Sequence, residues 1–226
     1  MTGIGTLREM ALHAGLKAYY ARPGDALEAK LDGFVIDILR GEQIIEIQTH
    51  NFAAIGRKLR KLTDKHPVRL IHPVAVERWI VRLAPDGRKV TSRRKSPRRG
   101  HVLQVFSELV SFPELLGHPN FTLEVALVRE EEVRQTDNTV RRRWRRDWRV
   151  TDRRLLEVVN TLTLTSPGDC AQFRPAGLTQ PFTTSDLARA LRQPLWLAQK
   201  MAYCLRGMGA LEAVGQRGRA ITYVWP

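Results

Sequence analysis

The amino-acid sequence predicts an α/β protein of two domains, and three features support this prediction. Helix-type and strand-type hydrophobic patterns alternate over the first part of the chain. Residue pairs that favour tight turns separate the predicted strands. A second, more helical pattern follows an arginine-rich stretch. The length of 226 residues agrees with one or two domains, because a domain usually holds roughly 100–200 residues.

The predicted first domain opens with a helix and a three-strand meander. An apolar stripe at helical spacing predicts the helix Thr6–Tyr20. Three short runs between Ala26 and Thr49 predict the strands of the meander. Their connections are Asp32-Gly33, a favoured type I′ pair, and Gly41-Glu42, which suits a type II′ turn. Two tight hairpins should therefore fix the register of the three strands.

A second helix and a strand follow the predicted meander. Asn51 can cap a helix at Phe52–Lys65, and Pro67 ends it before the strand Val68–Val74. The remaining elements predicted for this domain are a hairpin of Trp79–Leu83 and Lys89–Thr91, a helix at Val102–Leu116 and a strand at Phe121–Arg129.

The last part of the chain has a different pattern. Its predicted elements are helices at Leu155–Leu164, Thr184–Leu191 and Pro194–Met208, and strands at Leu211–Val214 and Ala220–Trp225. This order is typical of a winged-helix domain, in which the second helix of a helix-turn-helix reads nucleic acid. The predicted domains are therefore residues 1–135, a basic linker at 136–154, and a winged helix at 155–226.

The chain is basic, because 37 Lys and Arg residues outnumber 23 Asp and Glu residues and give a formal net charge of +14. Hydrophobic residues make up 43% of the chain, too much for a disordered protein. Clustered Lys and Arg gain affinity for phosphate backbones by releasing counterions. Nucleic acid, with DNA preferred, is therefore the expected partner, and an acidic membrane surface is the weaker alternative.

Composition also argues against several classes of protein. No apolar run approaches the ~18–20 residues that cross a membrane, and Met1–Glu9 lacks the order of a signal peptide. We therefore expect a cytoplasmic protein with no membrane association. Cys170 and Cys204 lie far apart and show no metal-ligand spacing, so neither a disulfide framework nor a zinc site is expected.

Three acidic residues should form a row on one face of the meander. Counting outward from the two turns places Glu28 opposite Asp37, and Asp37 opposite Glu46. Adjacent strands lie about 4.8 Å apart, so one cation could reach all three carboxylates. Like charges opposite each other in a sheet are unfavourable unless something compensates them. We therefore expect a bound Mg²⁺ or Mn²⁺ ion, since Mg²⁺ prefers carboxylate, water and phosphate oxygens.

Asp37, followed after a hairpin by Glu46-Ile47-Gln48, resembles the signature of the PD-(D/E)XK nuclease superfamily. The predicted element order resembles its restriction-endonuclease-like αβββαβ core over about Thr6–Val74, roughly a third of the chain. The resemblance implies that Asp37 and Glu46 bind metal, helped by the Ile47 carbonyl. It also implies metal-dependent hydrolysis of phosphodiester bonds in DNA by an activated water. Members often act as dimers, so a homodimer is one option.

The chain departs from this signature at Gln48, where the family has a lysine. A lysine can orient or help deprotonate the attacking water, whereas glutamine can only hydrogen-bond it. Lys30, on the same face, or Lys58, on the following helix, could supply the missing charge. Glu9 on the first helix is the reserve for Glu28 as third acid. The predicted catalytic residues are Asp37, Glu46, Gln48, Glu28 and Lys30, and the predicted metal ligands are Glu28, Asp37, Glu46 and Ile47.

Arginine-rich stretches and the predicted winged helix supply the expected nucleic-acid contacts. Interleaved arginines and tryptophans suit phosphate contact combined with stacking on bases. The expected contact residues are Arg93, Arg94, Lys95, Arg98, Arg99, Arg141, Arg142, Arg143, Trp144, Arg145, Arg146, Trp148, Arg149, Gln199, Lys200, Arg217 and Arg219. Two simpler interpretations remain open: a solvated linker, and a winged helix that docks a protein.

Three functions are consistent with the sequence. The first is a metal-dependent DNA endonuclease. The second is a noncatalytic nucleic-acid-binding or regulatory protein that uses a degenerate nuclease fold and a winged helix, which Gln48 favours. The third is a basic RNA-binding or ribosome-associated factor.

Overall fold

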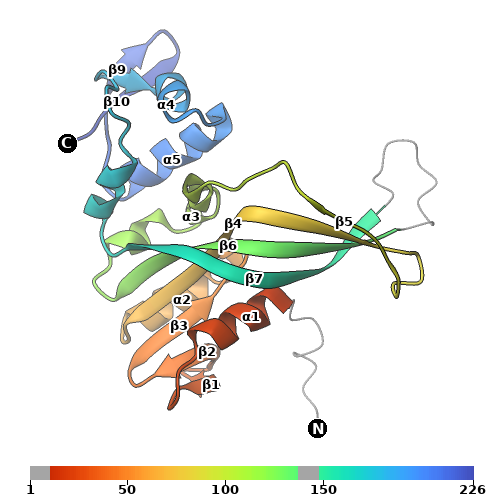
Figure 1. Cartoon of the computed structure of the whole chain (residues 1–226). Helices are drawn as coiled ribbons and strands as arrows, with labels where there is room; N and C mark the ends of the chain where they lie inside the picture. Colours follow the sequence, from red (N-terminus) through yellow and green to blue (C-terminus); the bar gives the residue numbers. More distant parts are fainter. Residues whose placement is uncertain (1–10, 137–147) are drawn as a thin grey trace. The chain divides into compact units, whose positions relative to one another are not determined.

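The computed structural model describes residues 11–136 and 148–226 and shows a mixed α/β fold built on a large mixed β-sheet (Figure 1). Over these residues the chain forms two compact units. The first unit takes the described residues of 1–24, 73–101 and 126–161, and the second takes 25–72, 102–125 and 162–226. Among the described helices, none has the length and apolar character that crossing a membrane requires.

The second unit begins with the predicted meander. Its strands are β1 (Ala26–Leu31), β2 (Phe34–Arg40) and β3 (Gln43–Ile47), and neighbouring strands are antiparallel. Asp32 and Gly33 both have positive φ, as a type I′ turn requires, and Gly41 has a φ of 58° at the first position of its turn. The turn residues therefore set the register as the sequence predicted.

The element after the meander is a short 3-10 helix, η2 (Phe52–Ala54), followed by helix α2 (Gly56–Thr63). The first residues of strand β4 (Val68–Leu83) then run parallel to β3, with Ile45 beside Arg69. The predicted order of helix, three strands, helix and strand is thus present, because helix α1 (Ala11–Tyr20) precedes the meander in the chain.

The core of the second unit is aromatic and aliphatic. Phe52 is fully buried and stacks on Phe112 with ring centroids 5.2 Å apart, and Phe112 meets Phe121 edge-on. The predicted helix Val102–Leu116 is instead broken into η3 (Val102–Val105), α3 (Phe106–Leu109) and η4 (Pro113–Gly117). Pro113 explains the break, since proline lacks an amide donor and forces the preceding residue out of helical geometry.

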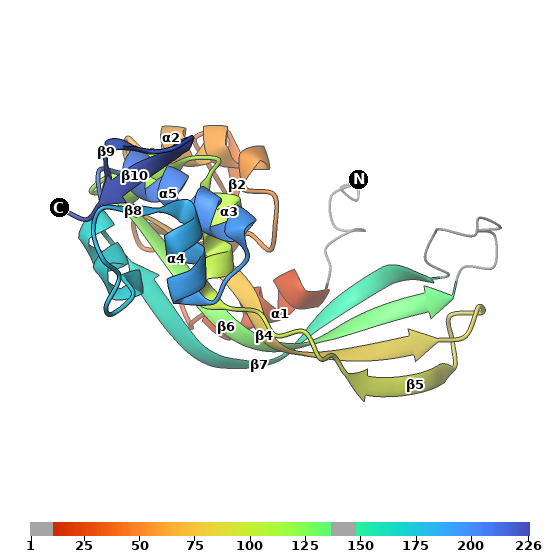
Figure 2. The same cartoon turned by 90° about the horizontal axis from the view of Figure 1, so that it is seen from above.

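The second unit ends with a small sheet and two helices. Its elements after the large sheet are η5 (Pro167–Phe173), β8 (Phe182–Thr183), α4 (Thr184–Leu191), α5 (Leu195–Gly207), β9 (Glu212–Arg217) and β10 (Ala220–Val224). Strand β10 lies between β8 and β9 in an antiparallel sheet. Both views show α4 and α5 gathered beside this sheet (Figures 1 and 2). The two predicted helices and two predicted strands of this region are therefore confirmed.

The first unit is a long sheet covered by one helix. Its strand order is β5 (Val90–Lys95), the end of β4, the end of β6 (Phe121–Thr136), and β7 (Trp148–Leu164). These strands lie side by side in both views (Figures 1 and 2). Helix α1 packs on β7, because the Ala11 amide donates to Asp152 at 3.2 Å and Gly15 lies directly against Leu155.

The helix predicted at Leu155–Leu164 is wrong, because these residues belong to strand β7. This segment is rich in β-branched residues, which favour a strand over a helix. Strand β7 begins at Trp148, inside the segment predicted as a linker. The predicted hairpin is confirmed by the pairing of Trp79 with Lys95 and of Leu83 with Val90. The limits predicted for the three domains stay a prediction.

Candidate acidic site and basic surfaces

The strand register agrees with the predicted pairing of the three acids on neighbouring strands. Strands β1 and β2 pair Leu27 with Ile38 and Ala29 with Ile36, which leaves Glu28 opposite Asp37. Strands β2 and β3 pair Ile38 with Ile45, which leaves Asp37 opposite Glu46 on the neighbouring strand. Tight turns alone therefore bring Asp37 and Glu46 onto adjacent strands.

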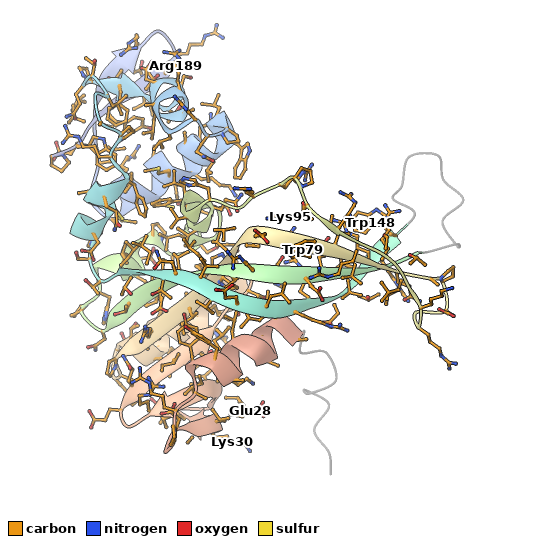
Figure 3. The ribbon with its side chains drawn as sticks, viewed as in Figure 1. Glu28, Lys30, Trp79, Lys95, Trp148 and Arg189 are labelled. Carbon is orange, nitrogen blue, oxygen red and sulfur yellow. The ribbon has the colours of Figure 1, made fainter. Side chains whose placement is uncertain are left out.

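Glu28 differs from these two acids in its backbone conformation and its exposure. Its φ of 51° lies in the left-handed region, so the pleat of edge strand β1 is disturbed at this position. Its side chain is exposed, and Figure 3 shows Glu28 and Lys30 on this edge strand. Over the residues that the structure describes, no group of three or more His, Cys, Asp and Glu side chains could hold a metal. The role of Glu28 as the third acid of the row therefore stays a prediction.

Glu46 is the most constrained of the predicted residues. Its side chain is buried, with 5% of the residue exposed, and its Oε2 lies 2.6 Å from the Lys58 Nζ atom. The same Nζ donates to the Val35 carbonyl oxygen at 2.6 Å. The other carboxylate oxygen, Oε1, is buried and has no hydrogen-bond partner among the described residues. One acceptor of a buried carboxylate is thus left for a proton or a cation.

Burial raises the pKa of Glu46 from 4.5 to about 7, since the charged form loses its hydration. The positive charge of Lys58 lowers this pKa, and the negative charge of Asp37 raises it. Asp37 is held beside Glu46 because its Oδ2 accepts a hydrogen bond from the Ile47 amide at 2.9 Å. A cation between the two carboxylates would favour their charged forms.

Gln48 is turned toward the loop that follows β3. Its Nε2 donates to the carbonyl oxygen of His50 at 2.6 Å and lies 3.2 Å from that of Asn51. The backbone carbonyl oxygen of Gln48 lies 2.8 Å from Nδ1 of the buried His72. Gln48 therefore stabilises the loop that leads to α2, and Lys58 of α2 supplies the positive charge near Glu46. Asp37, Glu46 and Lys58 are called the acidic site below.

The predicted basic residues of β5 fall into two groups. Arg93 stacks over the Trp79 ring at 4.2 Å and pairs with Glu131 at 2.7 Å, and Lys95 pairs with Glu77 at 2.5 Å. Arg94 and Arg98 are exposed, and their side chains make no hydrogen bond or ion pair with any described residue. Figure 3 labels Trp79 and Lys95 on neighbouring strands β4 and β5.

Arg94 and Arg98 belong to a pocket that the sequence did not predict. The pocket has a volume of about 390 Å³. Its charged and aromatic lining, called the arginine pocket below, consists of Arg78, Arg94, Arg98, Arg134, Arg153, Glu132 and Trp148. The Arg134 guanidinium lies 3.6 Å from the centre of the Trp148 ring. Sequence reasoning missed Arg78, Arg134 and Arg153 because they come from three separate strands.

Several predicted residues cannot be placed in either site. Glu9 and the six residues of Arg141–Arg146 lie outside the described residues. Arg99 is exposed, and Arg149 donates to the Gln135 side-chain oxygen at 3.2 Å. Their predicted roles in nucleic-acid binding stay predictions.

Comparison with known proteins places the chain in a family. Residues 10–165 match the family described as a domain of unknown function (DUF8091). The chain belongs to this family. It is similar to an uncharacterized protein of Treponema pallidum (strain Nichols), with 32% identity over 187 residues, or 82% of this chain and 74% of that protein. No solved structure matches the chain.

The DUF8091 region contains both the acidic site and the arginine pocket, while α4, α5, β9 and β10 follow it. In this last part, Gln199 and Arg219 line a cavity of about 710 Å³ together with Tyr203 and Arg206. Lys200 instead donates to the Ser107 carbonyl oxygen at 3.2 Å. Arg217 pairs with Asp186 at 2.9 Å. Two of the four residues predicted here therefore face an open cavity, and two make contacts within the protein.

Proposed function

We propose that this DUF8091 protein is a metal-dependent phosphodiester hydrolase that acts on DNA. One observation carries the proposal. The buried Glu46 carboxylate sits beside Asp37 and Lys58, and one of its oxygens has no hydrogen-bond partner among the described residues. Leaving a buried carboxylate oxygen unsatisfied costs free energy unless a proton or a ligand compensates it.

The acidic site fits a divalent cation bound by two carboxylates. Mg²⁺ usually keeps several waters and takes one or two protein carboxylates together with substrate phosphate oxygens. Glu46 Oε1 and the Asp37 carboxylate would hold the ion, and the predicted Ile47 carbonyl is a third candidate. When bound, such an ion stabilises negative charge on phosphate oxygens and makes water a better nucleophile.

Lys58 has two roles in this proposal. Its ion pair with Glu46 lowers the pKa of that carboxyl group and so favours the charged form that binds cations. Its Nζ is also held by the Val35 carbonyl oxygen at 2.6 Å, so the ammonium group is fixed beside Glu46 and could contact a bound phosphate. In this proposal Lys58 supplies the positive charge that the signature of the PD-(D/E)XK superfamily has at the position of Gln48.

The element order supports the restriction-endonuclease-like interpretation. Helix α1, the meander β1–β3, helix α2 and strand β4 follow one another as in the αβββαβ core that the sequence resembles. Asp37 and Glu46 then occupy the second and third strands of the meander.

The end of the chain supports a winged helix that binds duplex DNA. Helix α4 starts with a capping box in which Thr183 and Asp186 bond each other's amides, and α5 follows after a short turn. One stripe of α5 faces the cavity beside the β9–β10 hairpin: Leu195, Gln199, Tyr203 and Arg206. Polar and basic residues on the second helix are what major-groove recognition requires.

A noncatalytic nucleic-acid-binding protein is the second candidate. It is favoured by the amide of Gln48, which bonds the loop rather than the acidic site, and by the exposed position of Glu28. In this case the acidic site would have only a structural role, and Glu46 would be protonated or paired with Lys58 without a metal ion.

Metal-dependent cleavage separates the two candidates. Linear, nicked, flapped and branched DNA would be incubated with the purified chain and Mg²⁺ or Mn²⁺. Glu46→Gln keeps the size of the side chain but removes its charge, so we expect cleavage to fall by at least about a hundredfold. The control is Glu42→Gln, because Glu42 is exposed in the turn between β2 and β3. Cleavage that is unchanged in Glu46→Gln would overturn the proposed hydrolase.

A further inference from the structure

The arginine pocket is built from four strands of the first unit. Arg78 comes from β4, Arg94 from β5, Arg134 from β6, and Trp148 and Arg153 from β7. Arg98 follows β5 in the chain and completes the lining. Because neighbouring strands carry them, these side chains converge although they are far apart in the sequence.

The floor of the pocket is positively charged, although two buried acids contact its three arginines. Glu132 is 3% exposed, and it lies 3.2 Å from Arg78 Nη1 and 3.7 Å from Arg153 Nη2. Arg134 bonds the same carboxylate through its Nε at 2.7 Å. Arg78 also bonds Glu130 at 2.6 Å. These acids orient the three guanidinium groups, and the pocket lining of five arginines and one glutamate keeps a net positive charge.

Arg94 and Arg98 differ from their neighbours on β5. Successive residues of a strand point to opposite faces, so Arg93 and Lys95 share one face and Arg94 lies on the other. Arg93 and Lys95 are neutralised by Glu131 and Glu77, respectively. Arg94 and Arg98 line the pocket without an ion-pair partner among the described residues. Two exposed guanidinium groups beside a positively charged floor predict an anionic ligand.

We propose that the arginine pocket binds a phosphate group of a nucleic-acid strand and packs the attached nucleoside against Trp148. This inference deepens the proposed function and rests on its nucleic-acid substrate. Guanidinium forks match phosphate oxygens in geometry and charge. An indole ring suits stacking with any base. The volume of about 390 Å³ falls within the range of ligand pockets, roughly 300–1,000 Å³.

The test compares two double variants of the full chain that lose the same charge from the same region. Arg94→Gln with Arg98→Gln removes the two arginines of the pocket, and Arg93→Gln with Lys95→Gln removes the two paired cations on the other face. Binding of a labelled short oligothymidine is measured by fluorescence anisotropy in EDTA, where a metal-dependent hydrolase cannot cleave it. Salt is varied, because each lost phosphate contact reduces the salt dependence.

The pocket variant is expected to raise the Kd at least about tenfold and to reduce the slope of log Kd against log salt by about one to two. The control variant should change the Kd by less than about threefold, because Glu131 and Glu77 already neutralise Arg93 and Lys95, although the sequence predicted both as nucleic-acid contacts. Trp148→Ala should weaken binding about five- to tenfold, and Trp148→Phe should restore most of it. Equal losses in the two double variants would overturn the pocket, since the arginines would then act only through net charge.

Competition with the labelled oligothymidine identifies the ligand that the arginine pocket binds. Thymidine 5′-monophosphate should compete for the pocket in the wild-type chain, and thymidine without phosphate should not. Polyglutamate that competes as well as the mononucleotide would overturn a nucleic-acid ligand in favour of an acidic peptide. Glu46→Gln should bind the oligothymidine as the wild-type chain does. The two proposals can therefore fail separately. If Glu46→Gln loses cleavage but the pocket variant binds normally, the arginine pocket is not the binding site and the proposed hydrolase still stands.

Discussion

The acidic site and the arginine pocket use charge in opposite ways. At the acidic site Glu46 is buried and Asp37 and Lys58 are half-buried, and each acid has a particular neighbour: Glu46 has Lys58, and Asp37 has the Ile47 amide. In the arginine pocket the charge is in excess, and Arg94 and Arg98 are exposed at its edge. Burial makes an electrostatic interaction strong and specific, while exposure to water and salt weakens it.

This difference predicts how the two regions respond to substitution. At the acidic site a single substitution should have a large effect, because Lys58 is the one cation among the described residues that pairs with Glu46. In the arginine pocket several guanidinium groups share one ligand, so single substitutions should have graded effects. The predictions below are ordered by the size of the expected effect.

The largest effect is expected at Lys58. Lys58→Met keeps the length of the side chain and removes the charge that lowers the pKa of Glu46. Glu46 should then bind a proton in place of a metal, and the Mn²⁺-dependent cleavage rate should fall by roughly a hundredfold or more. The matched control is Lys61→Met, since Lys61 is an exposed lysine on the same helix. Equal rates for Lys58→Met and Lys61→Met would show that Lys58 has no part in the reaction.

A smaller effect is expected in the pH dependence of stability. The folded chain keeps the Glu46 proton up to a pKa of about 7, whereas the unfolded chain loses it near 4.5. The contribution of Glu46 to the free energy of unfolding should therefore be highest below pH 4.5. This contribution should decrease as the pH rises to about 7. The full difference is on the order of 3 kcal/mol.

Urea denaturation at several pH values measures this contribution. The comparison is between the wild-type chain and Glu46→Gln, which cannot lose a proton there. Subtracting the two curves removes the effect of the other titrating groups. A difference that does not change between pH 4.5 and 7 would show that the Glu46 carboxyl group titrates at the same pH in the folded and unfolded chains.

The smallest effect is expected on the β9–β10 hairpin. Arg219 lines the cavity beside α5, whereas Arg217 is held by Asp186 and by the Pro181 carbonyl oxygen. Arg219→Gln should weaken binding of duplex DNA about two- to fivefold through loss of a phosphate contact. Arg217→Gln should leave binding nearly unchanged but lower the unfolding temperature slightly. The reverse pattern would contradict the proposed winged-helix surface.

Turn chemistry made part of the site predictable from the sequence. Asp32-Gly33 and Gly41-Glu42 specify tight turns, and such turns fix the register of every residue in the meander. The positions of Asp37 and Glu46 on adjacent strands followed from that register. Lys58 was one of two candidates for the missing positive charge, and its ion pair with Glu46 favours it over Lys30 in the proposed site.

Other features depended on tertiary structure that no local pattern contains. The positive φ of Glu28 disturbs an edge strand. Counting alternate residues outward from a turn assumes a regular strand, so it cannot detect such a residue. The apolar positions of Leu155–Leu164 satisfied a helical period, although β-branched residues and pairing within the sheet made a strand. The arginine pocket joins four strands, so its residues have no common spacing.

The most direct test of the central claim is metal binding at the acidic site. Thermal unfolding would be followed at pH 8 with and without Mn²⁺, since Glu46 is then largely charged. We predict that Mn²⁺ raises the unfolding temperature of the wild-type chain and of the control Asp64→Asn, whose residue is exposed at the end of α2. Asp37→Asn should lose this increase. An equal increase in Asp37→Asn, or none in the wild-type chain, would contradict a metal site between Asp37 and Glu46.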